Sequence, residues 1–132
     1  FRSRDATGNL GITFNGEIYN FQELRRELQE TGVTFNSKSD TEVVLAAYRR
    51  WGAGCLDRLR GMFAFAICDA EQEHVFLARD RAGEKPLYYL VRNQTLQFAS
   101  ELKALMFRPD NRRGVSFSER PKRNLEGQLH KV

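Results

Sequence analysis

Two consecutive segments, residues 62–69 and 74–80, constrain the fold of this chain more than any other feature of its sequence. In the first segment Phe63, Phe65 and Ile67 alternate with smaller residues. Side chains of a β-strand point alternately to its two faces, so this period predicts a strand with one buried face. Because only the acidic sequence AEQE separates the two segments, we predict an antiparallel hairpin.

A first helix is predicted to follow Asn20 and to run to about Glu30, because apolar residues recur at helical spacing in FQELRREL. Asn20 and Glu23 have the spacing of a capping box, in which two side chains satisfy backbone N–H groups at the start of a helix. Gly32 follows the last helical residues and is typical of a helix end.

A second helix is predicted over TEVVLAAYRRWG, and Ser39 with Glu42 repeats the capping pattern at its start. Its apolar side chains share one face, namely Val43, Val44, Ala47, Tyr48 and Trp51. One or two further helical turns are expected around Cys55.

Shorter apolar segments complete the predicted secondary structure. Strands are expected at residues 11–14, 33–35, 86–91 and 95–100, and a last helix at residues 101–107. Short strands with interspersed helices favour an α+β fold in which helices pack on antiparallel sheet.

The loop RAGEK interrupts the sheet between the predicted strands at 74–80 and 86–91. We expect Arg79 and Asp80 to form an ion pair at the strand end. Gly83 is expected to set the turn together with the proline that follows the loop.

The composition excludes several classes of function. The chain has 132 residues, of which 41% are hydrophobic and 29% charged, as expected for a globular protein. No apolar run reaches the length of a membrane helix, and FRSRDATGN at the start lacks the apolar core of a signal peptide. We therefore expect a cytoplasmic protein without a membrane partner.

The excess positive charge is confined to the end of the chain. Residues 1–106 contain 14 Lys and Arg against 14 Asp and Glu, whereas residues 107–132 contain 7 against 3. The apolar pattern also ends there, so we predict one domain over residues 1–106 and a basic, flexible tail over residues 107–132. Because residues 109–132 have no aromatic platform beyond Phe117, nucleic-acid binding is the least favoured alternative.

Cysteine and histidine are too few and too scattered to indicate a metal site. Cys55 and Cys68 do not form a CxxC pair, and the only histidines are His74 and His130. Cys55 lies on a predicted apolar helical face and Cys68 in an alternating strand, where a thiol is usually inert. We predict no metal and no nucleophile among them.

Two polar segments carry the candidate chemistry. Asn15, Gly16 and Glu17 follow the first predicted strand, and Asp40 follows Ser39 at the second helix start. An amide side chain and a backbone N–H group can stabilise an oxyanion, and a carboxylate can bind an ammonium group. The same residues also fit simpler roles, since Asn-Gly is a common turn and an acidic residue stabilises the first turn of a helix. Spacing alone leaves both interpretations open.

The segments FNGEIYN, QELRREL, SDTEVVLAAYRRWG, LRGMFAFAICD, FLARDRAGEKPLYY and FASELKAL occur in this order. Together they resemble the glutamine amidotransferase domain of class II enzymes, and within that class the glutamine-hydrolysing asparagine synthetases. The resemblance covers residues 12–106. It implies a partial N-terminal-nucleophile hydrolase fold, in which two antiparallel sheets are stacked between layers of helices.

The resemblance also implies a reaction. In that family a cysteine at the start of the mature chain attacks the carboxamide of glutamine, and a thioester forms as ammonia leaves. Water then releases glutamate, and the ammonia reaches a synthetase domain in which ATP activates aspartate as an adenylate. Asparagine is the product, and a homodimer of the parent enzyme is compatible with the resemblance.

Carried over by motif position, the resemblance assigns roles to the candidate residues. Asn15 and Gly16 would form the oxyanion hole, through a side-chain amide and a backbone N–H group respectively. Gly16 and Glu17 would line the glutamine pocket, and Asp40 would bind the α-amino group of glutamine.

The chain departs from the family pattern at its start. The nucleophilic cysteine and the arginine-bearing segment that holds the glutamine carboxylate have no counterpart here. We therefore expect a domain truncated at its N-terminus and inactive alone, with ATP and Mg bound in a missing C-terminal synthetase domain and no cofactor in this fragment. Two alternatives are a non-catalytic binding module and another class II enzyme, such as a phosphoribosyl or sugar-phosphate amidotransferase or a glutamate synthase.

Overall fold

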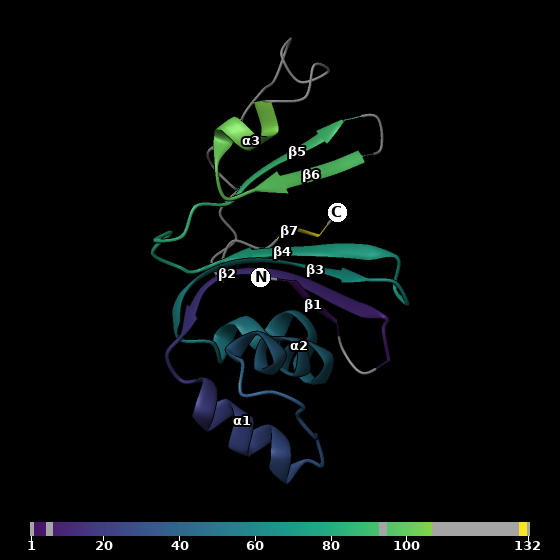
Figure 1. Ribbon diagram of the computed structural model, residues 1–132, viewed down its shortest axis with the longest axis vertical. Helices are drawn as coiled ribbons and strands as arrows, with labels where there is room; N and C mark the ends of the chain where they lie inside the picture. Colours follow the sequence, from purple (N-terminus) through teal and green to yellow (C-terminus); the bar gives the residue numbers. More distant parts are fainter. Residues whose placement is uncertain (1, 5–6, 93–94, 107–129, 132) are drawn as a thin grey trace.

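The computed structural model describes residues 2–4, 7–92, 95–106 and 130–131, which form a layered α+β fold (Figure 1). The strands are β1 (Arg2–Arg4), β2 (Leu10–Ile18), β3 (Gly61–Asp69), β4 (His74–Arg79), β5 (Tyr88–Arg92), β6 (Thr95–Ala99) and β7 (His130–Lys131). The helices are α1 (Phe21–Glu30), α2 (Asp40–Trp51) and α3 (Leu102–Met106), and a 3-10 helix, η1, covers Gly52–Asp57.

A five-stranded antiparallel sheet forms the centre of the fold, with strand order β1-β2-β3-β4-β7. β2 and β3 pair over their full lengths, from Leu10 opposite Asp69 to Ile18 opposite Gly61. β3 and β4 form the hairpin that the alternating sequence predicted. The sequence period therefore gave this part of the sheet correctly.

The helices α1 and α2 lie on one side of the five-stranded sheet, with α2 next to the sheet and α1 beyond it (Figure 1). α2 packs against β2, and α1 packs against α2. Every second residue of β2 and β3 is buried toward the helices, namely Leu10, Ile12, Phe14, Phe63, Phe65 and Ile67. No helix among the residues that the structure describes is long and apolar enough to cross a membrane.

Phe65 lies at the centre of this core and is only 1% exposed. Its ring centroid is 6.4 Å from that of Phe14, 5.5 Å from that of Phe63 and 6.1 Å from that of Phe76. These spacings are typical of favourable aromatic pairs. The ring cluster joins β2, β3 and β4 on the face that the helices cover.

β2 does not end at Phe14, where the sequence predicted the strand to give way to a polar segment, but continues through Asn15 and Gly16. Gly16 has a φ of 135°, which residues with a side chain rarely adopt. A Cβ atom at Gly16 would overlap the carbonyl oxygen of Met62, and one at Gly61 would overlap that of Glu17. The predicted end of the strand was wrong, and the simpler interpretation of Asn-Gly as a turn does not hold, because these glycines allow two paired strands to approach closely.

The capping prediction for α2 was correct at its first residue only. Ser39 Oγ accepts a hydrogen bond from the Thr41 N–H group at 3.1 Å. The Glu42 carboxylate does not complete a capping box, because it accepts from the N–H groups of Asn36 and Ser37 at 2.8 Å each. Glu42 therefore orders the loop before the helix.

The capping prediction for Asn20 was wrong, since its side chain makes no cap bond to α1. Instead, Asn20 Nδ2 donates to the Arg58 carbonyl oxygen at 2.8 Å, and Asn20 Oδ1 accepts from the Arg60 N–H group at 3.0 Å. The adjacent Tyr19 N–H group donates to the Arg60 carbonyl oxygen at 2.7 Å. These bonds tie the end of β2 to the segment that precedes β3.

The strand predicted at residues 33–35 does not form, because this described segment has no regular secondary structure. Val33 donates its N–H group to the Leu28 carbonyl oxygen, and Val33 and Phe35 pack partly buried against the core. The Arg25 guanidinium lies 4.4 Å from the centre of the Phe35 ring. The apolar residues of this segment pack on the core without pairing in a sheet.

The β5–β6 hairpin forms a second antiparallel sheet on the face opposite α1 and α2, and α3 packs against it (Figure 1). β5 begins at Tyr88, two residues later than predicted. Pro86, at the predicted start, has no N–H group to donate to a strand partner. The order helix, sheet, sheet, helix confirms the predicted α+β fold class.

Most of the predicted tail, residues 107–132, lies outside the described residues. Two residues in it are described as strand β7, in which His130 pairs with Leu77 and Lys131 pairs with Phe76 of β4. The flexibility predicted for the rest of the tail stays a prediction.

Phe65→Ala should lower the free energy of unfolding by about 3–5 kcal/mol, because it opens a cavity in the ring cluster. Tyr19→Ala is the control, because Tyr19 is 62% exposed and its change should stay within about 0.5 kcal/mol. Urea denaturation of both variants measures the difference. Equal losses of stability would show that the core does not lie where the structure puts it.

Candidate functional site

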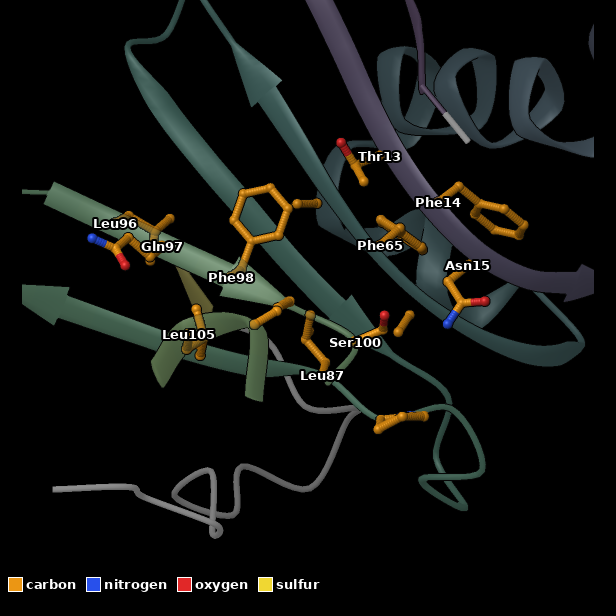
Figure 2. Close-up of a pocket in the computed structure, with 15 residues that line it drawn as sticks. Thr13, Phe14, Asn15, Phe65, Leu87, Leu96, Gln97, Phe98, Ser100 and Leu105 are labelled. Carbon is orange, nitrogen blue, oxygen red and sulfur yellow. The ribbon is translucent and has the colours of Figure 1, made fainter. Parts of the chain in front are cut away.

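Asn15 faces a cavity between the two sheets (Figure 2). The cavity has a volume of about 790 Å³. Its lining includes Thr13, Asn15, Ala64 and Ala66 from the five-stranded sheet, and Pro86, Leu87, Phe98, Ser100 and Leu105 from the opposite side. Ala64 and Ala66 lie opposite Asn15 and Thr13 in the strand register, and their small side chains leave room for a ligand. The Asn15 amide extends from β2 toward this space.

The Gly16 N–H group points to an open edge of β2. In an antiparallel ladder, a residue pair either exchanges both backbone hydrogen bonds or directs them to the outer neighbours. Phe63, opposite Gly16, directs its N–H and C=O groups to Asp80, at 3.2 and 2.8 Å. Gly16 therefore directs its own N–H group away from β3. β1 pairs with β2 only from Gly11 to Thr13, so no described strand covers this point.

Asp40 lies on the same edge of β2. Ile18, two residues after Gly16, has its N–H group directed to the same side, and this group donates to Asp40 Oδ2 at 3.2 Å. Asp40 is the first residue of α2 and is half-buried. Its other oxygen, Oδ1, lies 3.5 Å from Thr41 Oγ1. The start of α2 thus holds a carboxylate beside the strand that carries Gly16.

Glu17 has no partner that fixes its side chain among the described hydrogen bonds and ion pairs. It is exposed, and by strand alternation it lies on the same face as Asn15. It pairs with Met62 in the register but is not among the residues that line the cavity. The position of Glu17 is therefore less constrained by its surroundings than the positions of the other three predicted residues.

The four predicted residues lie within two short stretches that the fold brings together. The Gly16 N–H group and the Asp40 carboxylate share the open edge of β2, and Asn15 occupies the adjoining face. Same-side positions on a strand are roughly 7 Å apart, which is the approximate distance between the N–H groups of Gly16 and Ile18, and Asp40 Oδ2 lies 3.2 Å from the Ile18 nitrogen. The surface can hold an oxygen at one end and an ammonium group at the other.

Neither cysteine is placed to attack a group bound at Asn15. Cys55 is fully buried, and burial together with the nearby Asp57 carboxylate raises the pKa of its thiol to about 12. Cys68 is exposed, but it lies four residues along β3 from Ala64, the partner of Asn15, which is about 13 Å. This agrees with the expectation that neither acts as the nucleophile.

Asp80 is a buried acidic residue whose role the sequence interpretation missed. The predicted ion pair with Arg79 does not form, because the Asp80 carboxylate accepts from backbone N–H groups and the Arg79 guanidinium donates to the Gly83 carbonyl oxygen. Burial acts to raise the pKa of Asp80, but backbone hydrogen bonds outweigh it and hold the pKa below its usual value. The spacing of Asp80 from Gly83 in RDRAGEK is a turn signal that could have indicated this role.

Two further polar groups lie at the other end of the strands. Tyr48 Oη and His74 Nε2 are 2.7 Å apart, and burial, with the nearby Asp69 carboxylate and Cys55, raises the pKa of Tyr48. These groups bond to each other, and neither lines the cavity that Asn15 faces. In the part of the chain that the structure describes, no group of three or more His, Cys, Asp or Glu side chains could hold a metal ion.

The sequence pattern of the glutamine amidotransferase domain family matches residues 3–120. This chain belongs to that family. Asparagine synthetase [glutamine-hydrolyzing] 1 of Bacillus subtilis (strain 168) is 54% identical to this amidotransferase domain over 95 residues, which is 72% of the chain and 15% of the relative. Asparagine synthetase [glutamine-hydrolyzing] 3 of the same organism is 46% identical over 99 residues, 75% of the chain and 16% of the relative. The chain therefore spans only a small part of these relatives.

Solved structures agree with this family. Glutamine phosphoribosylpyrophosphate amidotransferase from B. subtilis matches with a TM-score of 0.66 and 26% identity, over 80% of this chain and 25% of that one. A second structure, described as the allosteric regulatory enzyme of purine biosynthesis, gives 0.65 and 26%, over 80% and 24%. The amidotransferase domain thus has a partial N-terminal-nucleophile hydrolase fold, as the resemblance implied.

Asp40→Ala should speed hydrogen exchange of the Ile18 amide by at least about tenfold, because the charge-assisted bond that protects it is lost. Asp40→Asn should largely keep the protection, since its amide oxygen can still accept the bond. NMR hydrogen exchange measures both, with the Asp80 amide, bonded to the Phe63 carbonyl oxygen, as the internal control. Unchanged exchange at Ile18 in Asp40→Ala would contradict this geometry.

Proposed function

We propose that this domain is the glutaminase portion of an asparagine synthetase, which hydrolyses glutamine to supply ammonia for the conversion of aspartate to asparagine. The observation that carries the proposal is the open edge of β2, where the Gly16 N–H group and the Asp40 carboxylate lie on one side of the strand, next to Asn15. The similarity to asparagine synthetases of Bacillus subtilis supports the choice of asparagine synthetase within the family.

The span of this surface suits glutamine. The carboxamide oxygen and the α-amino group of glutamine are joined by a short chain of bonds of about 1.5 Å each, comparable in length with the roughly 7 Å between same-side strand positions. In the proposal, the Asn15 amide and the Gly16 N–H group stabilise the oxyanion that forms at the carboxamide carbon. Asp40 binds the ammonium group, and Glu17 lines the pocket.

Two parts of the reaction belong outside these residues. The nucleophile is a cysteine at the start of the mature protein, and its attack on the carboxamide releases ammonia. ATP and Mg act in a separate synthetase domain, which is the proposed partner of this one. The small share of each relative that the chain covers, 15–16%, is consistent with such a larger protein.

A second candidate is another class II amidotransferase, favoured by the structural likeness to the phosphoribosylpyrophosphate enzyme. Both candidates use the same glutamine site and differ in the acceptor of ammonia. The higher identity to asparagine synthetases, 54% against 26%, favours the first candidate. A non-catalytic binding module is the outcome if no cysteine accompanies this segment.

Asn15→Ala should lower glutamine-dependent kcat by about a hundredfold to a thousandfold, the usual loss for one oxyanion donor. The measurement uses a full-length protein that carries this segment together with the family's cysteine, assayed for asparagine formation. Ammonia-dependent synthesis in the same variant is the control and should continue at its normal rate. Equal loss with both nitrogen donors would contradict the oxyanion role.

Asp40→Asn should raise the KM for glutamine at least about tenfold, because the charge that binds the ammonium group is removed while the bond to Ile18 can persist. Glutamine-dependent kcat should change less than KM, since the ammonium group does not react. Steady-state kinetics over a range of glutamine concentrations separates the two parameters. An unchanged KM would rule out this role for Asp40.

A further inference from the structure

Asp80 is a buried carboxylate whose described partners are main-chain groups. It is 4% exposed and follows directly after β4. Its Oδ1 accepts from the Glu84 N–H group at 2.9 Å, and its Oδ2 accepts from those of Phe63 and Lys85 at 3.2 and 3.1 Å. A buried carboxylate is retained only where such partners compensate for its desolvation. These three N–H groups belong to β3 and to the loop that follows β4.

The Phe63 N–H group belongs to β3, which pairs with β2 on the side away from its open edge. Strand pairing between β3 and β4 stops at Ala64 opposite Arg79. Asp80 extends it by one residue, since its own N–H group donates to the Phe63 carbonyl oxygen at 2.8 Å and its carboxylate accepts from the Phe63 N–H group. Phe63 is the register partner of Gly16. Asp80 thus fixes the backbone against which Gly16 packs.

The other two N–H groups belong to the loop that joins the two sheets. Glu84 and Lys85 lead directly to Pro86 and Leu87, which line the cavity that Asn15 faces. The Gly83 N–H group also donates to the Asp80 carbonyl oxygen, at 3.1 Å. The same carboxylate therefore holds the strand beneath the candidate site and the loop at the rim of its cavity.

Arg79 reinforces this loop from its other side. Its guanidinium donates to the Gly83 carbonyl oxygen, and Gly83 has a φ of 67°, where a Cβ atom would overlap that guanidinium. This loop is the direct connection from β4 to the β5–β6 hairpin, so its geometry helps to set where the hairpin lies over Asn15.

We propose that Asp80 is a positioning residue for the amidotransferase site. It holds the β3 backbone beside Gly16, and it holds the loop that leads to the cavity wall across from Asn15. This inference rests on the proposed function, because it assigns catalytic consequences to the geometry of that site. Asp80 touches no substrate in this account. It acts through the backbone of Phe63 and through the loop that ends at Leu87.

Asp80→Asn tests the proposal in a full-length protein with glutaminase activity. The variant replaces one acceptor oxygen by an NH₂ group, which would face an N–H donor. The backbone hydrogen bonds to that side of the Asp80 side chain must therefore break. A misplaced oxyanion donor weakens binding of the transition state more than binding of glutamine. We expect glutamine-dependent kcat to fall about tenfold to a hundredfold, with KM for glutamine and ammonia-dependent synthesis nearly unchanged.

Asp69→Ala is the matched control. Asp69 is also a buried carboxylate, 6% exposed, whose Oδ1 accepts from the Glu71 and Gln72 N–H groups at 3.0 and 2.9 Å. It orders the β3–β4 turn, at the opposite end of β3 from Gly16. A loss of stability alone should appear in both variants, whereas a selective fall in glutamine-dependent kcat should appear only at Asp80.

Asp80→Glu decides the result if Asp80→Asn does not fold, because it keeps the charge and both acceptor oxygens. It should recover part of the kcat that the asparagine variant loses, or show a smaller selective loss if it is the only variant that folds. The proposal is overturned if the folded Asp80 variants lose no more glutamine-dependent kcat than Asp69→Ala. Failure of the proposed function itself is distinct, because Asn15→Ala would then leave glutamine-dependent turnover unaffected.

Discussion

The close approach of β2 and β3 is the constraint on which the rest of this structure depends. Gly16 and Gly61 remove the two Cβ atoms that would hold the strands apart. Pairing can then continue to the end of both strands and fix which backbone groups face inward. The same register sends alternate N–H groups of β2 to its open edge, where Asp40 binds one of them. The fold and the candidate site therefore share a single geometric cause.

Sequence reasoning predicted the elements whose signal is local. The alternation around Phe65 gave the β3–β4 hairpin, and the apolar face around Tyr48 gave α2. It failed where distant partners decide the structure. Asn20 looks like a helix cap, but the backbone at Arg58 and Arg60 binds its side chain instead. Such bonds span 38 and 40 residues of sequence, so no local pattern could reveal them.

The roles of the candidate site residues stay predictions, but their arrangement in the fold differs from the one expected from the sequence. The family resemblance supplied Asn15, Gly16, Glu17 and Asp40, and the chemistry of each residue type allowed the roles. The sequence analysis placed Asn15 and Gly16 after the end of a strand, whereas they lie within β2. The register of β2 directs the Asn15 side chain to a face of the sheet and the Gly16 N–H group to its edge. Only the pairing of β2 with β3 determines these directions. The contribution of Asp80 was missed for a similar reason, since its partner Phe63 lies 17 residues away.

The direction of the backbone at the open edge of β2 also sets which substitutions the region can accept. Its N–H groups belong to the main chain, so a change of side chain at Ile18 affects packing but leaves the bond to Asp40 available. Proline is different, because it has no N–H group and would remove the donor itself. Natural variation at this strand edge should therefore be limited less by side-chain chemistry than by the exclusion of one amino acid. At Gly16 the limit is stricter, since only a residue without a Cβ atom fits against β3.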